Sequence, residues 1–246
     1  MLHVIFLIFI LSGIAAALTN LIPMNYTIPN DGMNLRCMRR DKNTREALYL
    51  QLEVNAQMSD GKQMIDYPAE KFILPEGIND TNMLTAAVHF LSYYQQLANL
   101  KFDKAEEILR SMEEKLAYYL PANLNLLELE RLFFMVLKHS PIEEIASIYA
   151  RSRILMAKAK TNIEVQRVRY VYETFMSEEE KKDILTLVTK TPIKRWKESN
   201  EEKLYQDFLK TVANYPVSGQ ADMNLQIVNY IRENYPNIGL DAEINL

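Results

Sequence analysis

The chain contains one cysteine and few glycines, and these two shortages exclude several classes of protein. Cys37 alone cannot form an internal disulfide, and it cannot build a zinc site made of several thiolates. Six glycines in 246 residues leave little material for the glycine-rich loops that bind nucleotide phosphates. With 14 tyrosines and 12 methionines against nine prolines, the composition favours a mostly helical chain.

The chain also has no excess of positive charge. Its net charge is −4 and its pI about 5.6, whereas a general nucleic-acid-binding surface is basic. Hydrophobic residues make up 48% and charged residues 24% of the chain, which excludes an intrinsically disordered protein. We therefore expect a folded protein with no nucleic-acid partner.

The first 30 residues contain no aspartate, glutamate, lysine or arginine. Residues 1–18 (MLHVIFLIFILSGIAAAL) are almost uniformly apolar, and 18 helical residues span about 27 Å, close to the hydrocarbon thickness of a bilayer. This pattern predicts a transmembrane helix. A cleaved signal peptide ending near Ala15-Ala16-Ala17 and a buried soluble helix are the two alternatives.

A cluster of basic residues follows the apolar run, and no basic residue precedes it. The cluster comprises Arg36, Arg39, Arg40, Lys42 and Arg45. Positive charge on the C-terminal side of a span retains that side in the cytoplasm. We therefore expect a single span in the cell membrane with a cytoplasmic C-terminal domain. In that orientation the glycosylation motifs at Asn25 and Asn79 would not be modified, because a cytoplasmic chain does not meet the transferase.

The segment directly after the apolar run combines two prolines with an Asp-Gly pair. It reads Asn20-Leu21-Ile22-Pro23-Met24-Asn25-Tyr26-Thr27-Ile28-Pro29-Asn30-Asp31-Gly32. The prolines favour extended backbone, and Asp-Gly favours a turn that can lead into another helix. A lone carboxylate beside lipid needs a partner, hydration or a metal, so Asp31 is either part of an interfacial helix cap with arginine partners or a metal ligand.

The pattern N-x-x-P followed by D-G at the end of a membrane helix resembles the second signature of the site-2 protease family, the membrane-embedded zinc metalloproteases. The resemblance implies that Asp31 is a zinc ligand, that Asn20 and Pro23 shape the loop beside the active site, and that Gly32 permits the turn. Asn30 stands where the family usually has leucine, and Met33 where it often has a second glycine. The resemblance to the site-2 protease family also implies a bacterial protein and regulated intramembrane proteolysis.

The first signature of that family, H-E-x-x-H, is absent from this chain. The three histidines are His3, His89 and His139, and none of them is followed by glutamate or by a histidine four positions later. We read His89 as a packed core residue and His139 as a residue at a helix end. The chain therefore resembles the C-terminal part of such a protease, and alone it should hold no zinc and hydrolyse nothing.

From about residue 43 onward the apolar residues recur with a helical period. Start signals such as Asn82, Ser140 and Ser177 agree with this period, and Pro121, Pro141, Pro192, Pro216 and Pro236 fall between the apolar segments. The pattern predicts helices near residues 43–58, 82–98, 101–119, 123–139, 141–159, 161–176, 178–190, 199–213 and 221–234, with residues 59–81 irregular.

Helices joined by two to four residues form antiparallel hairpins. Residues 98–106 (ANLKFDKAE) resemble the turn of a tetratricopeptide repeat, with Phe102 in the aromatic place and Ala105 at the close helix contact. The resemblance implies helical-repeat architecture, whose concave face commonly binds a peptide or protein partner. A plain helical domain without a partner is the alternative.

The segment Thr191–Lys197 has three cations around the only tryptophan of the sequence. It is either a solvated loop or a contact with an anionic membrane surface.

Together these features predict an all-α protein with a transmembrane helix over 1–22, a loop and basic juxtamembrane segment over 23–45, and a helical repeat-like domain over 46–246. Two functions follow from them. The first is the C-terminal part of a site-2-protease-like enzyme, which supplies Asp31 to a zinc ion held with ligands from elsewhere. The second is a membrane-anchored interaction module without catalytic activity.

Overall fold

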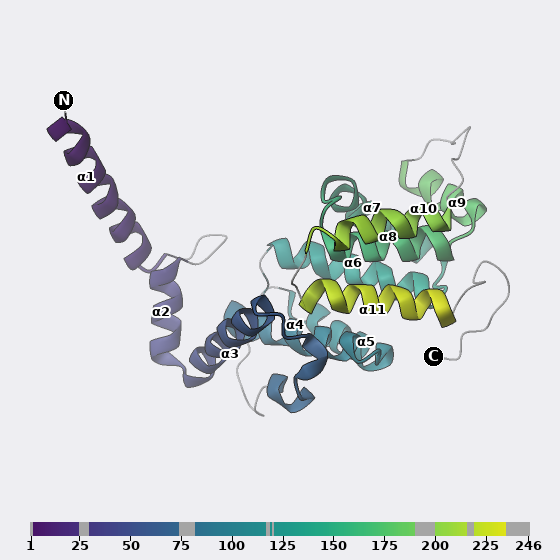
Figure 1. Ribbon diagram of the computed structural model, residues 1–246, viewed down its shortest axis with the longest axis horizontal. Coiled ribbons are helices and arrows are strands. Elements are labelled where there is room, and N and C mark those ends of the chain that lie inside the picture. Colours follow the sequence, from purple (N-terminus) through teal and green to yellow (C-terminus); the bar gives the residue numbers. More distant parts are fainter. Residues whose placement is uncertain are drawn as a thin grey trace.

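The computed structural model describes residues 2–24, 30–73, 82–116, 119, 121–189, 200–215 and 219–234. Within these ranges every regular element is a helix, which confirms the predicted all-α fold. An isolated N-terminal helix leads through a bent pair of helices into a packed helical body (Figure 1). The sequons at Asn25 and Asn79 and the segment around Trp196 lie outside the described residues.

The first helix, α1 (Leu2–Leu21), projects away from the helical body (Figure 1). Its span from His3 to Leu21 is the one helix, among the residues that the structure describes, that is long and apolar enough to cross a membrane. None of that span is buried in the protein, so it is not a core helix of the domain. Its apolar side chains are thus free to contact lipid.

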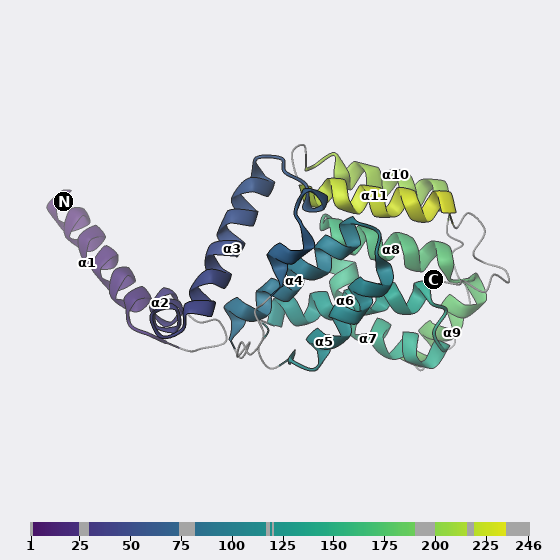
Figure 2. The ribbon, with the colours of Figure 1, turned by 90° about the horizontal axis from the view of Figure 1, so that it is seen from below.

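Two helices connect α1 to the body, namely α2 (Asp31–Arg40) and α3 (Lys42–Ser59). Asp41 separates them, and its carboxylate accepts hydrogen bonds from the backbone N–H groups of Asn43 and Thr44. This cap begins α3, while Arg39 and Arg40 in the last turn of α2 complement the helix dipole there. Figure 2 shows α3 running from the end of α2 toward the body.

Among the residues that the structure describes, the body contains eight further helices and two short 3₁₀ turns. Their bounds are η1 (Met64–Asp66), η2 (Ala69–Phe72), α4 (Met83–Ala98), α5 (Phe102–Glu113), α6 (Pro121–Leu137), α7 (Ile142–Lys158), α8 (Ile163–Phe175), α9 (Glu178–Thr189), α10 (Glu201–Val212) and α11 (Gly219–Asn234). Asparagine caps begin several of them, because the side chains of Asn82, Asn162 and Asn200 accept hydrogen bonds from the first-turn N–H groups.

Two pairs of consecutive helices pack closely, α4 against α5 and α6 against α7. From α6 onward the close contacts also join alternate helices: α8 lies against α6 and α10, and α9 lies against α7. In the first hairpin Phe102 and Ala105 are buried as the repeat-like turn predicted, and Leu100 closes the turn with a φ of 57°. One continuous core of aliphatic and aromatic side chains runs through these helices.

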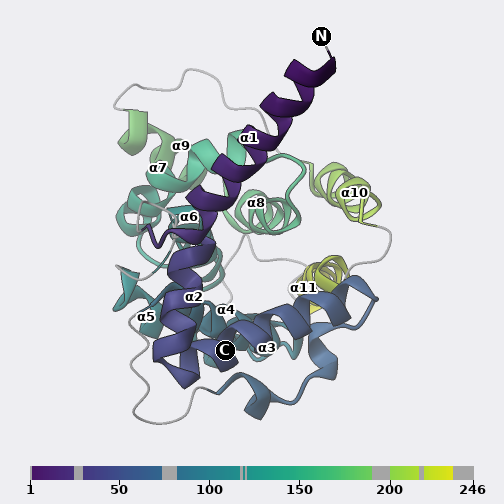
Figure 3. The same cartoon turned by 90° about the vertical axis from the view of Figure 1, so that its left-hand side faces the viewer.

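The last helix departs from a regular repeat stack. α11 lies beside α10 (Figure 2) and packs against α4 and α8, and it also touches α3 (Figure 3). A hydrogen-bonded pair, Gln63 and Asp222, ties it to the segment before η1 at 3.3 Å. The face of α4 and α8 that a simple repeat array would leave open is therefore covered by this chain's own C-terminal helix.

The turn expected at Asp-Gly leads into a helix, α2, that carries the basic juxtamembrane residues, and residue 46 lies inside α3 because Asp41 caps that helix. Two expectations from the sequence need correction. α5 ends at Glu113, several residues before the expected 119. The stretch after α3 is not fully irregular, because Met64 and Phe72 anchor η1 and η2 in the core with 2% exposure each.

Candidate functional site

The corner between α1 and α2 is built around the side chain of Asn30. Its Nδ2 donates to the carbonyl oxygens of Thr19 at 2.6 Å and Ile22 at 2.7 Å, near the C-terminus of α1. Its Oδ1 accepts from the backbone N–H groups of Met24 and Met33, both at 3.0 Å. Asn30 therefore caps the end of α1 and the beginning of α2 at once.

Gly32 brings the two helices into direct backbone contact. A Cβ atom at this position would lie 2.3 Å from the carbonyl oxygen of Leu21 and 3.0 Å from that of Asn20. Since real Cβ atoms do not approach so closely, only glycine permits this corner. Its role in the turn is thus steric: the close approach needs a residue without a side chain.

Asn20 and Pro23 lie on the α1 side of the same corner. Asn20 is in the last turn of α1, and its side chain is exposed while its carbonyl faces Gly32. Pro23 follows the end of α1 by two residues and is also exposed. Proline cannot continue the helical hydrogen bonding, so its position fits the point where α1 stops.

Asp31 is the first residue of α2 and lies in the chain between Asn30, which caps the helix, and Gly32. Its side chain is exposed, and within the described ranges its carboxylate has neither a hydrogen bond nor an ion pair. The cap of α2 is Asn30 rather than Asp31, and the expected arginine partners do not pair with it. The corner therefore presents an unpaired carboxylate just beyond the apolar helix.

Among the residues that the structure describes, Asp31 has no neighbouring side chains that would complete a zinc site. A catalytic zinc needs three protein ligands with one position left open, and the residues that the structure describes contain no group of three histidine, cysteine, aspartate or glutamate side chains that could hold a metal. Asp31 could supply one zinc ligand, because it is exposed and its carboxylate forms no hydrogen bond or ion pair within the described ranges. The remaining ligands would have to come from another segment or chain.

A second charged centre lies inside the helical body. Arg167 Nη2 on α8 lies 2.6 Å from both carboxylate oxygens of Glu130 on α6, and both side chains are fully buried. Tyr93 donates to the same carboxylate at 2.7 Å, and Arg167 Nε donates to Asn224 of α11 at 2.7 Å. Burial, together with the charge of Glu130, raises the pKa of Tyr93 well above its ordinary value.

This centre is a structural pair rather than a site. Arg167 also lies over the ring of Phe133, with 4.3 Å from Cζ to the ring centroid. Its four helices, α4, α6, α8 and α11, enclose it completely, so no substrate could reach it. Its effect is to fix how those helices sit against one another.

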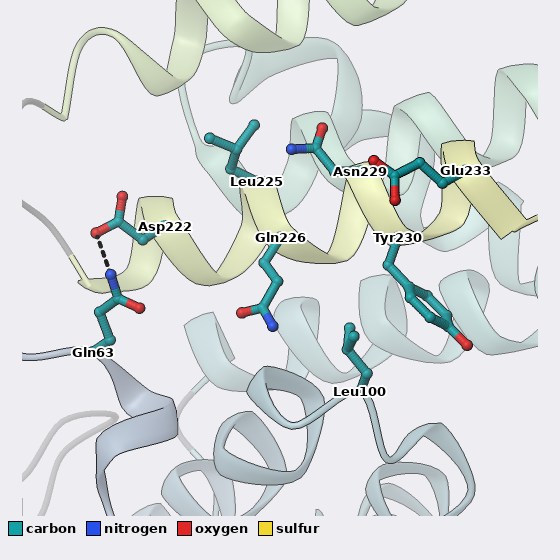
Figure 4. Close-up of a pocket in the computed structure, with 8 residues that line it drawn as sticks. All are labelled: Gln63, Leu100, Asp222, Leu225, Gln226, Asn229, Tyr230 and Glu233. Atoms are coloured by element: carbon teal, nitrogen blue, oxygen red, sulfur yellow. Dashed lines mark hydrogen bonds between the residues drawn. The ribbon is translucent and has the colours of Figure 1, made fainter.

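A shallow groove of about 470 Å³ follows one side of α11. Figure 4 shows its lining, which combines apolar and polar side chains: Gln63, Leu100, Asp222, Leu225, Gln226, Asn229, Tyr230 and Glu233. Two of these residues are acidic and none is basic. The groove suits a segment with apolar and basic side chains better than an acidic one.

The sequence singled out Asp31, Asn20, Pro23 and Gly32, and the structure places Gly32 against the backbone carbonyl of Asn20 at the α1–α2 corner. It did not reveal the part played by Asn30, which stood out only as a departure from the family pattern. A signal was present, since asparagine is a favoured N-cap residue before Asp-Gly and a helical run. The buried pair of Glu130 and Arg167 gave no signal, because 37 residues separate its members.

Comparisons with protein-family models, with curated proteins and with solved structures find nothing that matches this chain.

Proposed function

We propose that this chain is the C-terminal part of a site-2-protease-like intramembrane zinc metalloprotease, in which Asp31 supplies one zinc ligand. The observation that carries the proposal is the α1–α2 corner. An exposed, unpaired carboxylate is fixed at the end of an apolar helix by the double cap of Asn30 and the close approach of Gly32. The motif that resembles the family signature, with Asn30 and Met33 as departures, occupies the same corner.

In this proposal α1 spans the cell membrane and the helical body lies in the cytoplasm, where the basic residues after α1 retain it. A bound zinc ion would lower the pKa of its water and generate a nucleophile for peptide hydrolysis. Asp31 would coordinate the ion, and the α1–α2 corner would keep Asp31 in position. The two imidazoles and the glutamate that activates water would come from an H-E-x-x-H helix in a longer or partnered polypeptide.

Zinc stoichiometry tests the proposal directly. The 246-residue chain, purified in detergent, should contain no stoichiometric zinc. The same chain joined to the H-E-x-x-H helices, if they are encoded in frame upstream, should hold about one zinc ion per chain, and Asp31→Ala should weaken zinc binding at least tenfold.

Asp183→Ala is the matched control, because Asp183 is an exposed carboxylate on α9 outside the proposed site. It should leave zinc binding unchanged. Tight zinc binding by the isolated chain that is insensitive to Asp31→Ala would show that the site lies elsewhere. The absence of any H-E-x-x-H segment upstream, or on a co-purifying chain, would also contradict the proposal.

The groove beside α11 favours a second candidate, a membrane-anchored module that binds a protein or peptide partner. Asp222 and Glu233 would attract a basic segment while Leu225 receives an apolar side chain. Under this candidate a basic amphipathic peptide should bind the protein, and Asp222→Lys with Glu233→Lys should abolish binding. Asp31→Ala should leave it unchanged, which separates the two functions.

A further inference from the structure

The cationic side chains that follow α1 have few acidic partners. Arg36, Arg39 and Arg40 are exposed on α2, and in the part of the chain that the structure describes none of them forms an ion pair with a carboxylate. Lys42 alone pairs, with Glu46 at 3.3 Å. Five of the chain's 28 lysines and arginines thus lie within ten residues, although the whole chain is acidic.

The nearby carboxylates do not neutralise these arginines. Asp41 is engaged by the backbone N–H groups of Asn43 and Thr44 and by the Thr44 hydroxyl, and these hydrogen bonds hold the pKa of Asp41 below its usual value. Glu46 is engaged by Lys42. Asp31 lies at the opposite end of α2 from Arg39 and Arg40.

The three arginines lie on one face of α2, the same face as Gly32. Arg36, Arg39 and Arg40 follow Gly32 by four, seven and eight residues, which is the spacing of one helical face. Gly32 itself lies against the carbonyl of Leu21 at the end of α1. The arginine face is therefore the face of α2 that is turned toward the end of α1.

If α1 crosses a membrane, the orientation of this face of α2 places the arginines near the lipid headgroups. The end of α1 then lies at the lipid–water boundary, and the side of α2 turned toward it looks onto the headgroups. The arginines lie about 6 to 12 Å along α2 from Gly32, at 1.5 Å rise per residue. This is close to the screening length of about 8 Å at physiological salt, so their charge is felt at the surface.

We propose that the face of α2 formed by Arg36, Arg39 and Arg40 binds the phosphate groups of anionic phospholipids in the leaflet that receives the end of α1. The planar guanidinium group suits phosphate, to which it can donate two hydrogen bonds at once. Exposed Leu35 and half-buried Met38 supply apolar side chains on the adjoining face of the same helix. The inference rests on α1 being a membrane span, as in the proposed function, but it does not need zinc or proteolysis.

Cys37 makes the test specific, because it is the only cysteine in the chain and lies next to Arg36 on α2. The full chain, labelled there with a fluorophore, is placed in nanodiscs of phosphatidylcholine with phosphatidylglycerol. Spin-labelled quencher is then supplied on either lipid at equal mole fraction. Spin-labelled phosphatidylglycerol should quench at least threefold more strongly than the phosphatidylcholine form, and the preference should fall between 50 and 500 mM salt, roughly as counterion screening predicts.

Arg36→Gln, Arg39→Gln and Arg40→Gln together should abolish the preference without lowering helicity. The control combines Arg153→Gln, Lys158→Gln and Lys182→Gln, which removes three exposed cations from α7 and α9. Equal quenching by both lipids, or equal loss in the control, would overturn the proposal. If α1 does not insert, spin-labelled phosphatidylcholine will not quench in nanodiscs made of phosphatidylcholine alone, and that result identifies a failure of the proposed span.

Discussion

Asn30 shows how one side chain can organise a junction. Its amide uses both donors and its acceptor oxygen on four backbone groups: the carbonyls of Thr19 and Ile22, and the N–H groups of Met24 and Met33. Charged or aliphatic residues at this position could satisfy only part of this set. The identity of residue 30 therefore determines how firmly Asp31 is held.

Asn30→Ala should loosen α2 without unfolding the helical body. Loss of a cap typically costs about 1 kcal/mol, so amide exchange across α2 should accelerate roughly five- to tenfold. Asn30→Asp keeps the acceptor toward Met33 and loses the donors toward Thr19 and Ile22, so it should give an intermediate rate. Unchanged exchange in Asn30→Ala, measured by mass spectrometry, would contradict the double-cap role.

The buried pair of Glu130 and Arg167 makes a different kind of contribution. Arg167→Met would leave the Glu130 carboxylate buried without its cation, which typically costs 3–5 kcal/mol. The free energy of unfolding in urea should fall by about that amount. Adding Glu130→Leu to Arg167→Met should restore most of the stability, because the double variant leaves no unpaired charge. An equally small loss from Arg167→Met and from Lys42→Gln, which breaks an exposed pair, would show that the pair is unimportant.

Glu164 gives a pH-dependent prediction. It is 3% exposed at the start of α8, and burial raises its pKa above 4.5. Because the folded pKa exceeds the unfolded one, ionisation of Glu164 destabilises the fold above the folded pKa, and this penalty disappears below 4.5. Glu164→Gln should therefore have a higher Tm than the parent at pH 8, with the difference shrinking as the pH falls toward 4.5. A difference that is constant with pH, by calorimetry, would contradict this account.

Among the elements, α11 joins parts of the chain that are distant in sequence. It contacts α3, η1, α4, α8 and α10, and side chains of its two ends bind Gln63 and Glu202. At its first residue, a Cβ on Gly219 would lie 2.4 Å from the carbonyl oxygen of Lys62. The position of α11 therefore depends on the absence of a side chain there.

Gly219→Ala should push the start of α11 away from Lys62 and destabilise the body by about 1–3 kcal/mol. Gly13→Ala is a suitable control, because no atom lies within 4 Å of a Cβ built at Gly13 in α1. The measurement is urea unfolding followed by circular dichroism. If both substitutions are neutral, α11 can shift without loss and does not fix the fold.

At the scale of the whole molecule, charge and apolarity are separated along the chain. The apolar α1 stands apart from the body (Figure 1), the cationic α2 follows it, and the acidic residues lie mainly in the helical body. This order predicts that the body stays on the side of the membrane where it is synthesised.

Cysteine labelling of intact cells tests that orientation. In a Cys37→Ser background, a cysteine at exposed Lys182 or Lys203 should resist membrane-impermeant reagents from outside and react after the cells are opened. A cysteine on a protein known to face outward serves as the positive control. Efficient labelling of intact cells would mean that the body is exported and that α1 acts as a signal peptide.

The sequence by itself determined the helices of the body and the apolar N-terminal span. Apolar residues at a helical period mark one face of each helix, and capping residues and prolines mark the ends, so local chemistry suffices for α3 and for α4 to α11. It also marked Asp31, Asn20, Pro23 and Gly32 as neighbours in the chain at the end of the apolar span. For α2 the sequence indicated only that the Asp-Gly turn can lead into a helix, and the structure supplied its bounds, Asp31–Arg40.

Only the tertiary structure decided which helix faces meet. The pairing of Glu130 with Arg167, the covering of α4 and α8 by α11, and the groove along α11 all join residues far apart in the chain. Such contacts depend on how helices pack in space, and a periodic pattern specifies that a face is buried but not what it is buried against. The direction of the arginine face of α2 was settled in the same way, by the contact of Gly32 with the end of α1.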